Sequence, residues 1–307
     1  MITVESLTKR YGDKVAVDDL SFEVRPGLVT GFLGPNGSGK STTMRMILGL
    51  DRPTSGRALV DERRFADHPD GLRHVGALLD ASEVQGSRTA FAHLLAAAAT
   101  IGMGAGRVRA VLSLVGLDDV AGQRVESYSL GMRQRLGIAL ALLGDPPVVM
   151  LDEPVNGLDP DGVVWIRSLL RSLADEGRTV FVSSHLMSEV AQSADHLIVI
   201  GRGRLVADVP TVELLQEGGH TTTVRADEAA TLAPLLVARG AQVSRPAAEL
   251  LEVRGIGARQ IAQVALDHRL LIHELTQRSR SLEQAFMELT HSSLEYQGTT
   301  SGSGERR

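Results

Sequence analysis

The 307-residue sequence contains no cysteine, only three lysines among its 32 basic residues, and few aromatic side chains (3%). Without thiols, it offers no disulfides, zinc–thiolate sites or cysteine nucleophiles. Residues 94–106 and 136–151 are its longest bland or apolar stretches, and both are too short or too interrupted to cross a bilayer, which needs about 20 apolar residues. The net charge of −5 argues against a nucleic-acid partner, and the first residues lack the basic start and apolar run of a secretory signal.

An apolar fraction of 43% is enough to bury a core, and the length suggests about two domains. Apolar strands alternate with helices as far as residue 200, a pattern typical of an α/β fold with a parallel sheet. Beyond about residue 219 the pattern changes to shorter strands and helices. We therefore predict an α/β domain over 1–219, a small α+β module over 220–290 and a polar, disordered tail over 291–307.

Individual elements follow from the spacing of apolar residues and the positions of glycine and proline. The predicted strands of the first domain cover 2–8, 20–25, 28–33, 75–79, 148–151, 179–183 and 197–200. Its predicted helices cover 41–49, 132–143, 163–174 and 188–193, with further helices within 88–126 that break at Gly102–Gly106 and Gly116. In the module we expect strands over 221–225, 250–254 and 270–275, helices over 229–238 and 258–266, and a helical stripe of Leu282, Phe286 and Leu289.

A glycine-rich segment between an apolar strand and a helix start fits the pattern G-x4-G-K-S. Its residues are Gly34, Pro35, Asn36, Gly37, Ser38, Gly39, Lys40, Ser41 and Thr42. Glycines let the backbone turn tightly and expose N–H groups to phosphate oxygens, and the following helix adds its positive end. Lys40 is then the cation for the β- and γ-phosphates, and the Ser41 hydroxyl is a Mg²⁺ ligand. The alternative, an ordinary glycine-rich turn, does not explain the strand–helix context, so the sequence predicts a nucleotide site.

Two acidic residues follow the apolar strand 148–151. Because ligands bind at the carboxyl ends of parallel strands, Asp152 is placed to hold Mg²⁺, directly or through water. Glu153, one residue later, is placed to polarise a water for attack on the γ-phosphate. A solvated loop after a strand is the alternative, and the phosphate-loop motif favours the catalytic interpretation.

Further motifs lie in a fixed order around these two. Residues 128–135 (YSLGMRQR) resemble the LSGGQ signature of ATP-binding cassette (ABC) ATPases, residues 156–159 (NGLD) resemble their D-loop, and His185 occupies the position of their switch histidine. The resemblance covers residues 2–217. It implies an α/β P-loop ABC ATPase fold with a parallel core sheet, an antiparallel β subdomain, a helical subdomain over about 84–135, and here a small C-terminal α+β domain.

The resemblance also implies roles for individual residues. Glu153, His185 and Asp159 would be catalytic, with His185 contacting the γ-phosphate and Asp159 linking two sites across a dimer. The signature residues Ser129, Leu130, Gly131 and Met132 would bind the partner subunit's ATP in trans. Tyr11 matches the aromatic that stacks on adenine, although a surface turn aromatic is an alternative, as a helix cap is for His185. Leu130 and Met132 replace the usual glycine and glutamine.

The larger departure is Asp80, which occupies the position of the Q-loop glutamine. Its carboxylate can still ligate Mg²⁺, but an ionised carboxylate cannot donate a hydrogen bond. We therefore expect Asp80 to be either a metal ligand or sensor, or a plain loop residue.

Residues 280–290 (RSLEQAFMELT) are similar to the closing segment of drug- and antibiotic-resistance ATPases. Together the motifs predict an ATP hydrolase that uses ATP and Mg²⁺ and works as a homodimer with an integral membrane permease contacted through residues 88–126. Such a subunit would be cytoplasmic and peripheral on the inner face of the membrane, exporting a drug, antibiotic or other hydrophobic compound. A cassette enzyme acting on DNA or ribosomes and a small-molecule kinase are weaker alternatives, since a second phosphate loop is lacking and the signature is present.

Overall fold

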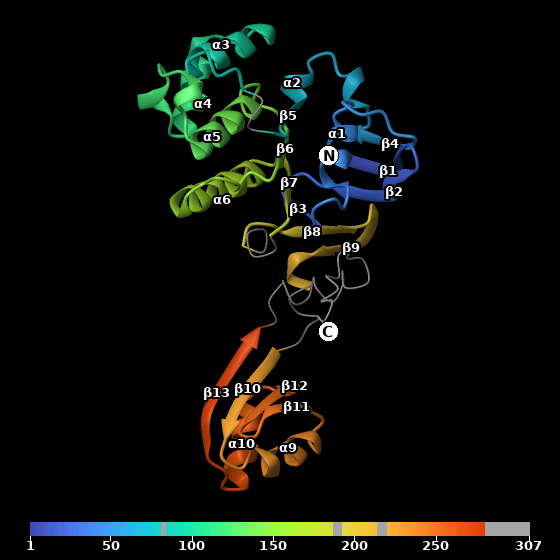
Figure 1. The fold of residues 1–307 in the computed structure, drawn as a ribbon, viewed down its shortest axis with the longest axis vertical. Coiled ribbons are helices and arrows are strands. Elements are labelled where there is room, and N and C mark those ends of the chain that lie inside the picture. Colours follow the sequence, from blue (N-terminus) through green and yellow to red (C-terminus); the bar gives the residue numbers. More distant parts are fainter. Residues whose placement is uncertain (81–83, 187–191, 214–219, 280–307) are drawn as a thin grey trace, which may run out of the picture. The chain divides into compact units, whose positions relative to one another are not determined.

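The computed structural model describes residues 1–80, 84–186, 192–213 and 220–279. These divide into two compact units, one reaching Val209 and the other beginning at Pro210 (Figure 1). The domain boundary predicted from the sequence, near residue 219, lies about ten residues after this division. Most of the predicted helix 188–193, the stripe of Leu282, Phe286 and Leu289, the segment 280–290 and the tail 291–307 lie outside the described residues.

A six-stranded sheet in the order β5-β6-β7-β3-β8-β9 forms the centre of the first unit. The strands are β3 (Val29–Leu33), β5 (Val75–Leu78), β6 (Val148–Asp152), β7 (Thr179–Ser184), β8 (His196–Gly201) and β9 (Arg204–Pro210). The first five in sheet order run parallel, which confirms the α/β prediction. Every residue of β3, β6 and β7 is buried because both faces of the sheet are covered.

Strand β9 was not predicted. It follows β8 after the two-residue turn Arg202–Gly203, and a connection this short joins antiparallel neighbours. All its residues are exposed or only half-buried, so its sequence lacks the apolar alternation on which strand prediction depends.

A three-stranded antiparallel sheet, in the order β2-β1-β4, packs on one face of this core. Its strands are β1 (Ile2–Tyr11), β2 (Lys14–Val24) and β4 (Ser55–Val60), and helix α1 (Lys40–Ile47) belongs to the same side (Figure 1). The rings of Phe22, Phe32 and Phe181 lie 5.0–5.8 Å apart within the shared hydrophobic core. Three of the six phenylalanines thus join β2 to β3 and β7, where they anchor the phosphate loop's strand.

The opposite side of the core sheet carries the longer helices (Figure 1). These are α3 (Ala90–Thr100), α4 (Ala105–Leu114), α5 (Leu130–Ala141) and α6 (Pro160–Asp175). The short helices of this unit are η1 (Phe65–Asp67), α2 (Gly71–His74), η2 (Asp118–Val120) and η3 (Val125–Ser127). Gly102 and Gly116 follow the ends of α3 and α4 with positive φ, as the predicted helix breaks required. Within the described ranges, each helix is too short or too polar to span a bilayer.

The second unit is a split βαβ arrangement around its own hydrophobic core. Its elements are β10 (His220–Ala226), α9 (Ala229–Val237), β11 (Gln242–Ala247), β12 (Leu250–Arg254), α10 (Ala258–Asp267) and β13 (Ile272–Ser279). They form an antiparallel sheet in the order β11-β12-β10-β13. The sequence predicted five of these six elements and missed β11, an exposed edge strand that contains Pro246.

Candidate functional site

The phosphate loop connects β3 to α1 and is packed so closely that glycine is required at two positions. A Cβ on Gly34 would lie 2.5 Å from the carbonyl oxygen of Ile200, and one on Gly39 would lie 2.6 Å from that of Ala16. Gly39 also has φ +106°, which side chains rarely adopt. The backbone N–H of Gly203, after β8, donates to the carbonyl of Ser38 at 2.9 Å. Neighbouring strands therefore hold the loop in its turned conformation.

Two polar side chains of the loop are buried beside this turn. The Oγ of Ser38 is enclosed and has no hydrogen-bond partner among the described residues. Lys40 is only 6% exposed, and its Nζ donates to the carbonyl of Gly34 at 2.7 Å. Burial lowers the pKa of Lys40, and the nearby carboxylates of Glu153 and Asp152 act in the opposite direction. Lys40 lines a cavity beside the loop, so the loop presents an ammonium there, a group that suits phosphate oxygens.

The two acids at the end of β6 are organised by β7. The Ser183 hydroxyl donates to Oδ1 of Asp152 and accepts a hydrogen bond from the backbone N–H of Glu153 at 3.0 Å. One carboxylate oxygen of Glu153 lies 3.8 Å from Lys40 Nζ, and the other lies 2.7 Å from Nδ1 of His185. The carboxylate thus lies between the cation of the phosphate loop and the histidine, three groups that the chain supplies from distant positions.

Glu153 lines two adjoining cavities. The first, of about 390 Å³, is otherwise lined by Tyr11, Lys14, Ala16, Asn36, Gly37, Gly39, Lys40, Ser41 and Thr42. The second, of about 290 Å³, is otherwise lined by Leu79, Asp80, Leu130, Gln134, Asp152 and Asn156. Asp80, the residue at the Q-loop glutamine position, therefore lines the same cavity as Asp152 and Glu153.

Tyr11 ends β1 at the mouth of the first cavity, with 49% of its surface exposed. Its hydroxyl donates to Asp51 at 3.1 Å, and Arg45 of α1 donates to the same carboxylate oxygen at 3.0 Å. The Lys9 ammonium lies 4.9 Å from the ring centroid. Burial, followed by the Asp51 contact, raises the pKa of Tyr11. The ring is thereby held near the loop, with about half of its surface exposed.

The signature residues lie at the first turn of α5. Ser129 caps this helix, its Oγ accepting from the N–H of Met132 at 3.2 Å, and its hydroxyl proton stays available to a ligand. Gly131 packs on the neighbouring loop, since a Cβ there would lie 2.8 Å from the carbonyl oxygen of Gly157. Asp159 caps α6 through the N–H of Gly162 at 2.9 Å. Leu130 lines the second cavity, whereas Ser129, Gly131, Met132 and Asp159 are not among the residues that line either cavity.

Three residues that the sequence left without a role are part of this arrangement. Ser183 bridges the two acids, Gln134 donates to the backbone carbonyl of Glu153 at 3.3 Å, and Asp51 holds Tyr11. A signal existed for Ser183, because parallel pairing of the strand after Asp152 with 179–183 places Ser183 beside Asp152, as the register shows. Asp51 follows the helix α1 by a few residues and carried no comparable signal.

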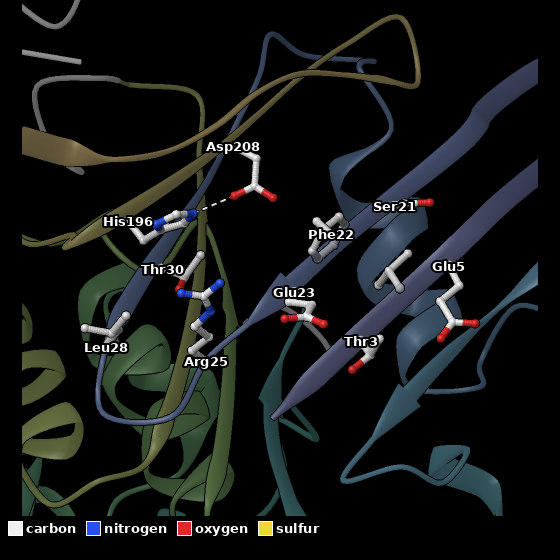
Figure 2. Close-up of a pocket in the computed structure, with 11 residues that line it drawn as sticks. Thr3, Glu5, Ser21, Phe22, Glu23, Arg25, Leu28, Thr30, His196 and Asp208 are labelled. Atoms are coloured by element: carbon white, nitrogen blue, oxygen red, sulfur yellow. Dashed lines mark hydrogen bonds and ion pairs between the residues drawn. The ribbon is translucent and has the colours of Figure 1, made fainter. Parts of the chain in front are cut away.

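A larger cavity, of about 470 Å³, lies elsewhere, at the amino-terminal ends of β3 and β8 (Figure 2). Its charged groups are partly paired, since His196 contacts Asp208 at 2.5 Å and Glu5 contacts Arg57 at 2.6 Å. The phosphate loop follows the carboxyl end of β3, so this cavity is separated from it by the length of the strand. Cavity volume is therefore a poor guide to the nucleotide site. We choose the two smaller cavities as the candidate site because the motif residues line them.

The chain is similar to known proteins of one family. Residues 17–156 match the family model described as ABC transporter, and residues 220–283 match a domain of unknown function. The chain is 43% identical over 213 residues to the bacitracin transport ATP-binding protein BcrA of Bacillus licheniformis, covering 68% of this chain and 70% of that protein. It is 33% identical over 293 residues to the uncharacterized ABC transporter ATP-binding protein YhcH of Bacillus subtilis, covering 94% and 96%.

Among solved structures, the first unit resembles a dimeric, post-hydrolysis ATP-binding cassette bound to ADP and inorganic phosphate. The TM-score is 0.64 at 25% identity, and the match covers 69% of this chain and 99% of that one. The first unit therefore shares its fold with a nucleotide-hydrolysing cassette.

Proposed function

Since this chain belongs to the ABC transporter family and is an ATP-binding, ATP-hydrolysing subunit, we propose that it drives a separate integral membrane permease that exports a drug, antibiotic or other hydrophobic compound. The observation that carries the proposal is that the Lys40 ammonium and the His185 ring both lie beside the carboxylate of Glu153. The bacitracin-transport protein from Bacillus licheniformis supports an antibiotic as cargo.

ATP fits the first cavity in the family's manner. Six residues of the phosphate loop line this cavity, where the backbone N–H groups of such a loop can meet phosphate oxygens: Asn36, Gly37, Gly39, Lys40, Ser41 and Thr42. Lys40 would neutralise the β- and γ-phosphates, and the exposed face of Tyr11 would stack on adenine. Residues 34–42 would together form the triphosphate site.

Mg²⁺ would be held by Ser41 and Asp152, with Asp80 as a further oxygen ligand. Within the described part of the chain, no three His, Asp or Glu side chains form a metal-binding group. One hydroxyl and two carboxylates suit Mg²⁺, which usually binds one or two carboxylates and completes its shell with phosphate oxygens and water. Bound there, the ion would neutralise charge on the β- and γ-phosphates.

Hydrolysis would use Glu153 as the base. Its carboxylate would take a proton from the water that attacks the γ-phosphorus, as the bond to the ADP oxygen breaks. His185 is hydrogen-bonded to Glu153 and would orient both the carboxylate and the γ-phosphate. Ser183 keeps Asp152 and Glu153 in fixed relation throughout.

A homodimer would complete each site. In this arrangement Ser129, Gly131 and the first turn of α5 close over the γ-phosphate bound by the partner subunit, and Asp159 links the two sites. ATP binding would then close the dimer and hydrolysis would open it, moving the permease. The subunit would work peripherally on the cytoplasmic face of the membrane, with residues 88–126 of the helical subdomain (about 84–135) contacting the permease.

A transport experiment tests this proposal. We expect co-expression of the chain with its permease to raise resistance to bacitracin-like antibiotics. The same pair carrying Glu153→Gln should raise resistance no more than the permease alone. Equal resistance with both versions would show that ATP hydrolysis by this chain does not power export, while leaving its ATPase activity to be measured separately.

Removing residues 220–307 tests our proposal that the ATP-binding domain is residues 1–219 and that 220–290 form a separate regulatory or dimerisation module. The two hydrophobic cores share no residue, and that of the first unit ends at Ile200. We therefore expect the truncated chain to bind ATP within about threefold of the full chain, and its dimerisation or regulation to change. Titration with a fluorescent ATP analogue measures the first effect and gel filtration with ATP the second. Loss of ATP binding would contradict the boundary.

A further inference from the structure

We infer that Gln134 is a positioning residue that makes the placement of Glu153 depend on the signature helix α5. This inference rests on the proposed role of Glu153 as catalytic base. It concerns a contact within one subunit, between the helical subdomain and the acidic end of β6.

The backbone of Glu153 needs external support. Its φ is +50°, in the left-handed region that residues with a side chain rarely occupy. Such a conformation persists only where surrounding groups impose it. At Glu153 it turns the chain sharply after β6, so that the side chain points back to Lys40 and His185.

Two buried side chains supply that support from opposite sides. Ser183 Oγ accepts from the N–H of Glu153 at 3.0 Å, and Gln134 Nε2 donates to its C=O at 3.3 Å. Ser183 is fully buried and Gln134 is 5% exposed, so water competes little for either bond. Both backbone groups of Glu153 are thereby bonded to buried side chains, and its C=O also accepts from the backbone N–H of Asn156 at 3.2 Å. Gln134 is the partner that ties this carbonyl to α5, whereas Asn156 lies in the loop that follows β6.

The two supports belong to different parts of the molecule. Ser183 ends β7 of the core sheet, whereas Gln134 lies on α5, one turn after Leu130 in the signature. Leu130 and Gln134 line the same cavity as Glu153 and Asp80. Any shift of α5 against the core sheet therefore lengthens or tightens the bond to the Glu153 carbonyl. Closure of the signature over the partner's nucleotide would in this way be transmitted to the carboxylate.

Replacing Gln134 with methionine tests this, because methionine keeps the length and volume and removes the donor. We expect Gln134→Met to lower kcat by about tenfold to a hundredfold, as a small misplacement of a catalytic group does, with the Kd for a fluorescent ATP analogue unchanged within twofold. The matched control is Gln192→Met, at an exposed position outside both cavities and outside residues 88–126, which should leave kcat unchanged.

A double-mutant cycle separates positioning from general structural damage. If Gln134 acts through the Glu153 carboxylate, Gln134→Met should cause no further loss of residual turnover in a Glu153→Gln background, followed with radiolabelled ATP over long incubations. An unchanged kcat in the single variant, the same fold-loss in both backgrounds, or a parallel fall in ATP affinity and thermal stability would each overturn the inference. Wild-type turnover in Glu153→Gln alone would instead overturn the assignment of Glu153 itself, which is part of the proposed function.

Discussion

Glu153→Gln is expected to reduce ATP turnover at least about a hundredfold while ATP binding stays close to that of the wild type, because general-base catalysis contributes about 10²–10⁴ in rate. The amide has the shape of the carboxylate and can keep a hydrogen bond to His185, but it cannot take a proton from water. It also removes a negative charge that lies 3.8 Å from Lys40 Nζ, beside the proposed γ-phosphate position. Phosphate release measures turnover, and titration with a fluorescent ATP analogue measures binding.

The same variant should accumulate as a dimer. If hydrolysis opens the closed pair, blocking it leaves ATP held between two subunits. Gel filtration with ATP and Mg²⁺ should then show the dimer for Glu153→Gln, and mainly the monomer for the exposed-site control Glu62→Gln, which turns over its ATP. A variant that binds ATP and remains monomeric would contradict the proposed head-to-tail arrangement.

Lys40→Ala is expected to weaken ATP binding by about tenfold to a hundredfold, since a charge-assisted hydrogen bond contributes about 1.5–3 kcal/mol. The ammonium is the cationic group of the phosphate loop and lies buried between the Gly34 carbonyl and Glu153. Lys40→Arg should not restore binding, because the planar guanidinium is too large for a group that is 6% exposed and contacts the loop's own carbonyls.

Calorimetric titration with ATP measures this loss. The control is Arg239→Ala, an exposed residue of the second unit, which should leave the affinity unchanged. Thermal unfolding of each variant without nucleotide separates lost binding from lost folding. An unaltered affinity in Lys40→Ala would remove the phosphate-loop assignment.

Much of the fold could be predicted because the core sheet is covered on both faces. Strands β3, β6 and β7 each contain a run of apolar residues, and the helix of residues 130–141 is largely buried, so their sequences carry strong signals. Strands β9 and β11 lie at sheet edges with mostly exposed side chains. Their backbones are held by pairing with a neighbour, which leaves little trace in the local sequence.

The candidate site divides in the same way. The phosphate loop could be predicted because its glycines, lysine and serine are consecutive, and their chemistry depends on local backbone shape. Asp152 and Glu153 could be predicted because a buried parallel strand must end at the ligand-binding edge. Asp51, Ser183 and Gln134 could not be given their roles, because each acts on a residue from 19 to 40 positions away.

By itself, the sequence determined the order and chemistry of the motifs, and one lysine among so few already indicated where a compact cation was needed. Only the tertiary structure decided how those groups meet. The register of β6 with β7 brings Ser183 to both acids, and the packing of α5 brings Gln134 to the carbonyl of Glu153. Local motifs depend on a few adjacent dihedral angles, whereas these contacts depend on the relative position of whole strands and helices, which the complete core sets.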